Sequence, residues 1–182
     1  MAYNIAFAMM FFGFFVYLTD VWHYSISRAG IAVMPGPMSV VIVAMFIGPL
    51  FRKYGRRFLL LSGSVLLSAT ALWFMGIPGD APNYFGTWLP GMLISGVGVG
   101  ILIPGLAAAT VSELPAQKYS VGSAINQTVR QIGSVLGVAV FVGAVGIQSR
   151  LHADFGIAYG IQFGFSLLTC GLCALIRDPA TA

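Results

Sequence analysis

One segment of the chain combines a charged side chain with amides and hydroxyls inside an otherwise apolar run. It covers residues 121–146, and Arg130 is the charged residue within it. Its polar companions recur at three- and four-residue spacings that share one face of a helix: Ser123, Asn126, Gln127 and Ser134. A charge at bilayer depth costs roughly 2.5–3.5 kcal/mol, so it normally faces a protein interior or a wet cavity. We therefore expect Asn126, Gln127, Arg130 and Ser134 to line a substrate cavity or a gate.

Other chemistry is poorly supported by the residues. The two histidines, His23 and His152, fall in predicted loops beside Asp20 and Asp154. Neither loop supplies enough ligands to hold a metal, and no nucleophile–base pattern such as G-x-S-x-G occurs. The sequence predicts no enzyme, no metal site and no cofactor.

Two further motifs have simpler explanations. The glycines at 96, 98 and 100 suggest a nucleotide-binding loop, but no strand precedes them and the apolar run continues. Cys170 and Cys173 lack a second pair or a nearby histidine, so we expect them to pack as small apolar side chains.

The composition predicts the environment in which these residues act. Of 182 residues, 58% are hydrophobic and 8% are charged, whereas soluble domains carry about 25% charged residues. The surrounding solvent is therefore expected to be membrane lipid. The net charge of +4 is spread over loops except for one cluster at 52–57, so a nucleic-acid partner is not expected.

Apolar runs long enough to cross a bilayer define the elements. We expect an all-α membrane protein, with residues 1–182 forming a single six-helix transmembrane domain. The predicted spans are 2–18, 30–51, 58–77, 84–110, 121–146 and 157–176. Their connections are too short for a soluble domain.

Lysine and arginine in the connections predict the orientation. One side has six basic residues, from the segment 52–57, Lys118 and Arg177, whereas the other has only Arg28 and Arg150. The first side should be cytoplasmic, which places both termini inside the cell. Aromatic residues near the outer interface are then expected as belt residues: Trp22, Tyr24, Tyr84 and Trp88.

Small and polar residues at helical spacing predict contacts between helices. Gly133 and Gly137, and likewise the row of glycines at 156, 160 and 164, are expected to allow close approach of neighbouring helices. A polar row in the last span is expected to form hydrogen bonds between helices: Tyr159, Gln162, Ser166 and Thr169.

The basic connection carries a recognisable pattern. It reads G-x-L-x-x-x-x-G-R-R and contains Gly48, Leu50, Arg52, Lys53, Gly55, Arg56 and Arg57. The pattern resembles the loop signature of the major facilitator superfamily. That signature has an aspartate where this chain has Arg52, so the similarity is to the looser copy found in C-terminal halves.

Two longer segments are similar to the fourteen-helix drug:proton antiporters of the EmrB/QacA type. Residues 22–36 are similar to the passage G-Y-S-x-x-x-A-G-x-x-x-x-P-G, and residues 121–139 are close to the segment G-S-A-x-x-N-x-x-R-Q-x-G-x-x-x-G-x-A. The resemblance implies the last six helices of such a transporter, with Met1 near the start of its ninth helix. The chain is then expected to be half of a split transporter or a fragment.

The resemblance implies a proton-coupled multidrug efflux transporter of the cell membrane that works by alternating access. Its substrates would be small hydrophobic or cationic compounds, and its partner an N-terminal half or a second copy. All five acidic residues of this chain read as loop or tail residues, so the titrating acid would come from the other half. The alternative is an incomplete, transport-inactive membrane fragment or assembly partner.

Two roles remain open for Arg130. It lies about 14 Å along the helix from Val121 at a rise of about 1.5 Å per residue. It could line the central cavity, where Asn126 and Gln127 offer hydrogen bonds to a substrate. It could instead lie near the cytoplasmic mouth and pair with carbonyls or an acid of the other half. The second role is favoured, because a cavity for hydrophobic cations should avoid a fixed positive charge.

Overall fold

The computed structural model describes residues 1–76, 82–111, 114–146 and 152–175 of the chain. Most of these residues are helical, and none of them lies in a strand. The elements in chain order are α1 (Ala2–Asp20), α2 (Ile26–Val33), α3 (Pro35–Tyr54), α4 (Arg56–Gly76), the π-helix η1 (Tyr84–Trp88), α5 (Leu89–Val111), the 3₁₀ turn η2 (Ala116–Lys118), α6 (Tyr119–Val145) and α7 (His152–Ala174). Within this part of the chain, six helical stretches are long and apolar enough to cross a membrane. The predicted all-α membrane fold is confirmed.

The boundaries of the spans differ from the predicted ones mainly at their polar ends. The second span begins at Ile26 rather than residue 30, because Ser25 Oγ accepts a hydrogen bond from the Arg28 N–H (3.4 Å) and caps α2. The last span begins at His152 rather than 157, so part of the predicted connection between the spans 121–146 and 157–176 is helical. A helix backbone thus continues past the apolar run that predicted it. The predicted ends at 77 and 176 lie outside the described residues.

The basic segment 52–57 is not a loop, and this part of the prediction was wrong. Helix α3 continues to Tyr54 and α4 begins at Arg56, so that Gly55 alone separates them. Gly55 has φ 80° and ψ 152°, a combination that is essentially restricted to glycine. The glycine therefore reverses the chain in one residue, and the basic side chains project from two helix ends.

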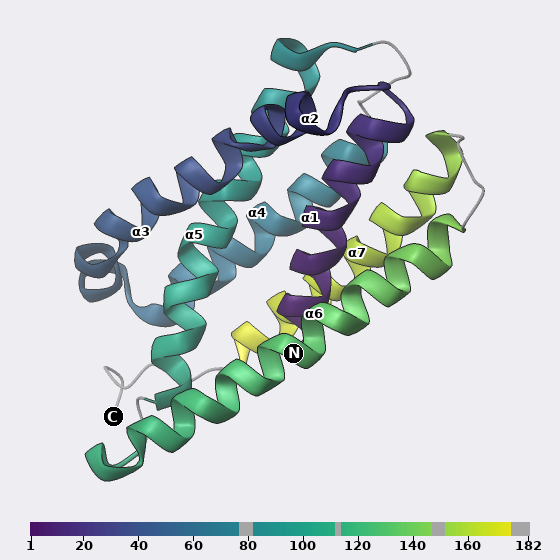
Figure 1. Cartoon of the computed structure of the whole chain (residues 1–182). Coiled ribbons are helices and arrows are strands. Elements are labelled where there is room, and N and C mark those ends of the chain that lie inside the picture. The colour runs from purple at the N-terminus through teal and green to yellow at the C-terminus, as the bar shows by residue number, and fades with distance from the viewer. Residues whose placement is uncertain (77–81, 112–113, 147–151, 176–182) are drawn as a thin grey trace.

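The helices form two layers (Figure 1). In this view α3, α5, α1 and α6 lie in front, with α3 and α6 at the two sides, and α4 and α7 lie behind. Helix α1 is central, since 67% of its span is buried against 22% for the spans containing α3 and α6. The two outer helices α3 and α6 thus expose most of their surface.

Glycines determine how closely the helices approach. A Cβ atom on Gly96 would lie 2.6 Å from the Gly36 carbonyl oxygen of α3, and one on Gly98 would lie 3.1 Å from the Gly63 carbonyl oxygen of α4. Helix α5 therefore lies between α3 and α4 at distances that only glycine allows. The glycines at 96, 98 and 100, whose spacing suggests a nucleotide-binding loop, lie inside this helix.

One of the two predicted glycine rows is a helix contact. A Cβ on Gly137 would lie 2.5 Å from the Ile5 carbonyl oxygen, so the close approach of α6 to α1 is confirmed. The row in α7 was wrongly interpreted. A Cβ on Gly156 or Gly164 would meet nothing within 4 Å, and one on Gly160 would meet only the end of the Met75 side chain at 3.8 Å. Spacing alone does not show which face of a helix is covered.

An aromatic cluster fills the interior at the end of the bundle opposite Gly55. Trp88 is fully buried, and its ring centroid lies 5.0–5.5 Å from those of Phe14, Tyr17, Trp22 and Phe74. The prediction that Trp22 and Trp88 are belt residues was therefore wrong. Their rings pack inside the protein because α1, α4 and η1 converge there.

The polar row of α7 is buried but does not link helices. Ser166 and Thr169 donate hydrogen bonds to the carbonyl oxygens of Gln162 and Phe165 in their own helix. The hydroxyl of Tyr159 and the amide of Gln162 have no partner among the described residues. The prediction of interhelical hydrogen bonds from this row was wrong, since i−4 carbonyls satisfy short hydroxyl side chains.

Candidate functional site

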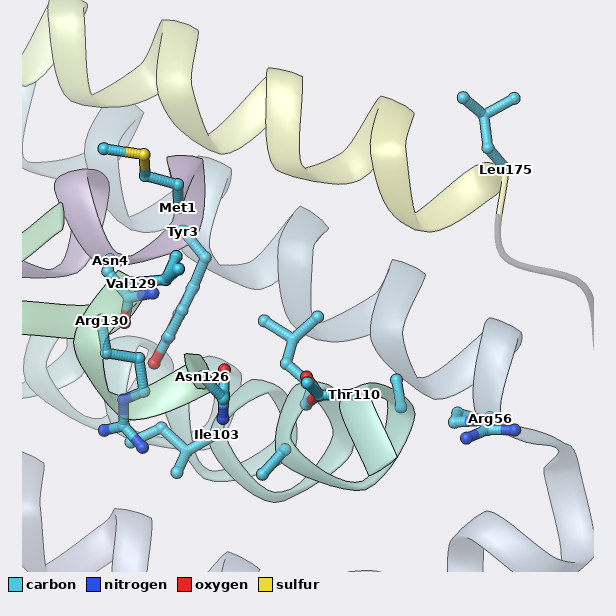
Figure 2. A pocket seen from close by; sticks show the side chains of 13 residues that line it. Met1, Tyr3, Asn4, Arg56, Ile103, Thr110, Asn126, Val129, Arg130 and Leu175 are labelled. Atoms are coloured by element: carbon cyan, nitrogen blue, oxygen red, sulfur yellow. The ribbon is translucent and has the colours of Figure 1, made fainter. Parts of the chain in front are cut away.

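A cavity of about 540 Å³ opens between α1, α5 and α6. Arg56 lines it, so it lies at the end of the bundle that carries the basic segment. Figure 2 shows the side chains around it. Its polar lining comes from four helices: Tyr3, Asn4, Arg56, Thr110, Asn126 and Arg130.

Arg130 is the charged group contributed by α6. Its side chain is half-buried and extends beside Ile103 of α5 in Figure 2. Within the described part of the chain, it makes no hydrogen bond or ion pair. A guanidinium carries five N–H donors and is always charged. The cavity therefore contains a positive charge whose hydrogen-bonding capacity is unused by these residues.

The first turn of α1 supplies the opposite wall. Tyr3 and Asn4 are 4% and 7% exposed, and the Tyr3 ring reaches toward Arg130 in Figure 2. The Tyr3 hydroxyl has no hydrogen-bond partner among the described residues. A buried hydroxyl without a partner costs about 1–3 kcal/mol. Tyr3 thus presents a second unused donor next to the guanidinium.

The structure divides the predicted polar stripe of α6. Asn126 and Arg130 line the cavity, because a separation of four residues brings them nearly above one another. Ser134 is half-buried and does not line the cavity. Gln127 and Ser123 are exposed on α6 and do not line it either. The helix rotates by about 100° per residue, which carries Gln127 away from its neighbour Asn126.

The predicted basic motif contributes one side chain to the cavity. Gly48 and Leu50 are exposed on α3, and Arg52, Lys53 and Arg57 are exposed at the helix ends. Lys53 Nζ lies 5.1 Å from the centre of the Tyr54 ring. Arg56 is half-buried, engages a partner and lines the cavity. The motif therefore connects the α3–α4 reversal with the site.

Sequence reasoning missed the contributions of α1 and α5. Tyr3, Asn4 and Thr110 are the polar residues concerned. Each is a polar residue near the end of an apolar run on the side carrying 52–57, which was the available signal. No spacing relates them to Arg130, since they belong to other helices.

A second cavity of about 250 Å³ lies between α1, α3 and α5. Its walls are apolar: Phe7, Met10, Phe11, Phe14, Val40, Met92 and Val99 are among the lining residues. Ser95 also lines it, but its hydroxyl donates to the Met92 carbonyl oxygen within α5 (2.7 Å). Ile103 lines both cavities, so the two are adjacent along α5. The apolar aromatic face of α1 lies here.

The described residues contain no group of three His, Cys, Asp or Glu side chains that could hold a metal ion. Asp20 ends α1, and Asp154 lies in the first turn of α7, so both belong to helices rather than to the predicted loops. The other three acidic residues lie outside the described ranges.

Six apolar helices in two layers, with cavities along one layer, define a multi-pass helical membrane protein. Residues 1–138 match the Major Facilitator Superfamily. This match covers most of the chain, and the chain belongs to that family.

Similar proteins are named for transport, export and resistance. The chain is 29% identical to the "Probable actinorhodin transporter" of Streptomyces coelicolor over 140 residues, which is 73% of the chain and 24% of the relative. It is 27% identical to the cephamycin export protein CmcT of Amycolatopsis lactamdurans over 171 residues, or 88% of the chain and 35% of the relative. It is 22% identical to the lincomycin resistance protein LmrB of Listeria monocytogenes over 157 residues, or 86% and 33%. The chain thus spans about a quarter to a third of the length of these relatives.

Proposed function

We propose that the chain is the C-terminal six-helix half of a proton-coupled multidrug efflux transporter of the fourteen-helix type. The observation that carries the proposal is that both cavities are lined mainly by one layer, formed by α1, α3, α5 and α6, with Arg56 of α4 and Leu175 at the rim of the first cavity. Transporters of this architecture bind substrate near the bilayer midplane, between two halves that move relative to each other. The exposed outer helices α3 and α6 leave this layer open to a second half.

The other wall of the transport path would come from a partner, either an N-terminal half or a second copy of the chain. No carboxylate lines either cavity among the described residues. A proton cycle needs a group that titrates in the working range, and arginine stays protonated. The proposal therefore assigns the titrating acid to the partner. It places the protein in the cell membrane with the basic end and both termini in the cytoplasm.

The relatives support export of drug-like compounds, as their names indicate. The proposed substrates are small hydrophobic compounds, including the cationic ones that the sequence resemblance implied. The apolar second cavity suits the hydrophobic part of such molecules.

The alternative function is a transport-inactive fragment or assembly partner. The chain spans between 24% and 35% of three relatives named for transport, export or resistance, and the alternative applies if no further spans accompany it. The DNA upstream of Met1 discriminates the two. An in-frame region or a neighbouring gene encoding further spans favours the transporter half, and a clean ribosome-binding site without a partner gene favours the alternative.

The direct test is reconstitution of transport. The chain is co-expressed with a matching N-terminal half, and export of ethidium, a neutral dye and an anionic dye is measured with and without a protonophore. We expect protonophore-sensitive export of at least one dye only when both chains are present. Arg130→Ala should reduce this export, whereas Arg28→Ala, an exposed arginine of α2, should not.

Absence of export for every dye, with both chains in the membrane, would overturn the proposal. Export that is unchanged in Arg130→Ala would remove Arg130 from the mechanism.

A further inference from the structure

The two cavities together form an amphipathic site. The first contains the Arg130 guanidinium, which has no hydrogen-bond or ion-pair partner among the described residues, and the second is walled by apolar side chains. They meet at Ile103 and both run along α1, from Tyr3 in the first to Phe14 in the second. Tyr3 and Phe14 are separated by about 17 Å along the helix, since Phe14 follows Tyr3 by eleven positions at about 1.5 Å per residue. That length suits an elongated molecule with one polar end.

The polar end of this site consists of hydrogen-bond donors. Arg130 offers guanidinium N–H groups and Asn126 an amide, and Tyr3 offers a buried hydroxyl that has no partner in the described part of the chain. No carboxylate among the described residues lines the cavity to balance the guanidinium. Oxygen atoms of an anion are the acceptors that such donors bind most strongly, because the hydrogen bonds are charge-assisted.

The charge also discriminates against cations. A guanidinium is always charged, so a cationic group entering the first cavity would meet a like charge that no carboxylate among the described lining residues compensates. An anionic group would remove the cost of leaving the guanidinium unpaired. The electrostatics of the cavity thus favour a negative ligand.

We propose that the first cavity binds the anionic group of an amphiphilic molecule, a carboxylate, sulfonate or phosphate, whose apolar part occupies the second cavity. The proposal rests on the proposed function and narrows its substrate range: it favours anionic amphiphiles and excludes, at this site, the cationic compounds that the sequence resemblance implied. The same chemistry is presented by an exported amphiphilic acid and by the headgroup of an anionic lipid.

The test is a binding measurement on the full 182-residue chain, purified in neutral detergent. The probes are dansyl-undecanoate, its neutral methylamide and its trimethylammonium analogue, which share the same apolar chain. Dansyl fluorescence should show the carboxylate binding about tenfold more tightly than the amide, the factor expected for a charge-assisted hydrogen bond. The cationic analogue should bind most weakly. The measurement does not require transport, so its failure is distinguishable from failure of the export test.

Matched variants locate the site. Arg130→Gln should lower the affinity for the carboxylate about tenfold and change that for the amide less than twofold. Tyr3→Phe removes only the hydroxyl and should give a smaller loss, again confined to the carboxylate. Arg28→Gln is the control, because the Arg28 side chain of α2 lies over the Tyr24 ring and lines neither cavity. Circular dichroism and size exclusion verify folding, and Asn126→Leu replaces Arg130→Gln if that variant does not fold.

Equal affinities for the carboxylate and the amide in the unchanged chain would overturn the proposal. An equal loss for both probes in the variants, or the same loss in Arg28→Gln, would also overturn it. Competition then identifies the source of the anion. Stronger displacement of the probe by phosphatidylglycerol than by dodecanoate, each compared with phosphatidylcholine, assigns the site to a lipid headgroup. The opposite order assigns it to a free amphiphilic acid.

Discussion

Single residues of this chain have roles that depend on backbone conformation as much as on side-chain chemistry. Arg130 and Asn126 provide donors to the cavity, whereas Gln127, adjacent in sequence, faces away from it. Gly55 contributes no side chain at all, yet its positive φ joins α3 to α4 without a loop. The position of Arg56 at the cavity depends on that reversal, because Arg56 is the first residue of α4.

The two glycines of the basic motif should respond differently to the same substitution. Gly55→Ala should lower the free energy of unfolding by about 1–3 kcal/mol, since alanine does not tolerate φ 80° with ψ 152°. Gly48→Ala is the control, because it lies within α3 where a Cβ meets nothing within 4 Å. It should be neutral or stabilise by up to about 1 kcal/mol. Thermal unfolding in detergent, followed by circular dichroism, measures both, and equal melting temperatures would contradict the conformation described for Gly55.

At the scale of elements, close approach between helices is achieved by glycine on specific faces. Helix α6 packs on α1 through Gly133 and Gly137, and α5 packs on α3 and α4 through alternate glycines. These contacts hold the first turn of α1 near α6, which brings Tyr3 and Asn4 opposite Arg130. The glycines of α7 at 156, 160 and 164 have the same spacing, but Gly156 and Gly164 face open space and Gly160 meets only the end of the Met75 side chain.

Substitution at the α1–α6 contact should separate these helices. Gly137→Ala places a Cβ 2.5 Å from the Ile5 carbonyl oxygen, and such overpacking typically costs about 1–3 kcal/mol. Gly143→Ala, on the same helix, adds a Cβ where nothing lies within 4 Å and should change the unfolding free energy by less than about 0.5 kcal/mol. Unfolding in increasing concentrations of denaturing detergent compares them. A larger loss at Gly143 than at Gly137 would mean that α6 packs through another face.

At the scale of the whole molecule, the spans alternate in direction, and one end carries Arg52, Lys53, Arg56, Arg57 and Lys118. The α3–α4 reversal and the α5–α6 connection lie at the end where the first cavity opens. The excess of arginine and lysine at this end favours the cytoplasmic side of the membrane. The site for the anionic group would then open toward the cell interior.

Reporter fusions test this orientation. Green fluorescent protein fused after Lys118 or at the C-terminus should fluoresce, because this reporter folds in the cytoplasm. Alkaline phosphatase fused after Asn83 should be active, because η1 begins at the opposite end, which we expect to face outward. Fluorescence and phosphatase activity in the reverse pattern would show that the basic end faces outward.

The sequence by itself determined the environment, the number of spans and the presence of a charge inside one of them. These properties follow from local composition and from helix periodicity, which involve residues close together in the chain. It could not determine that Tyr3 and Asn4 lie opposite Arg130, that Arg56 enters the cavity, or that Trp88 is buried. These three features depend on packing between helices that are distant in sequence. The tertiary structure decides this packing, because only a few helix faces carry glycines that allow close contact.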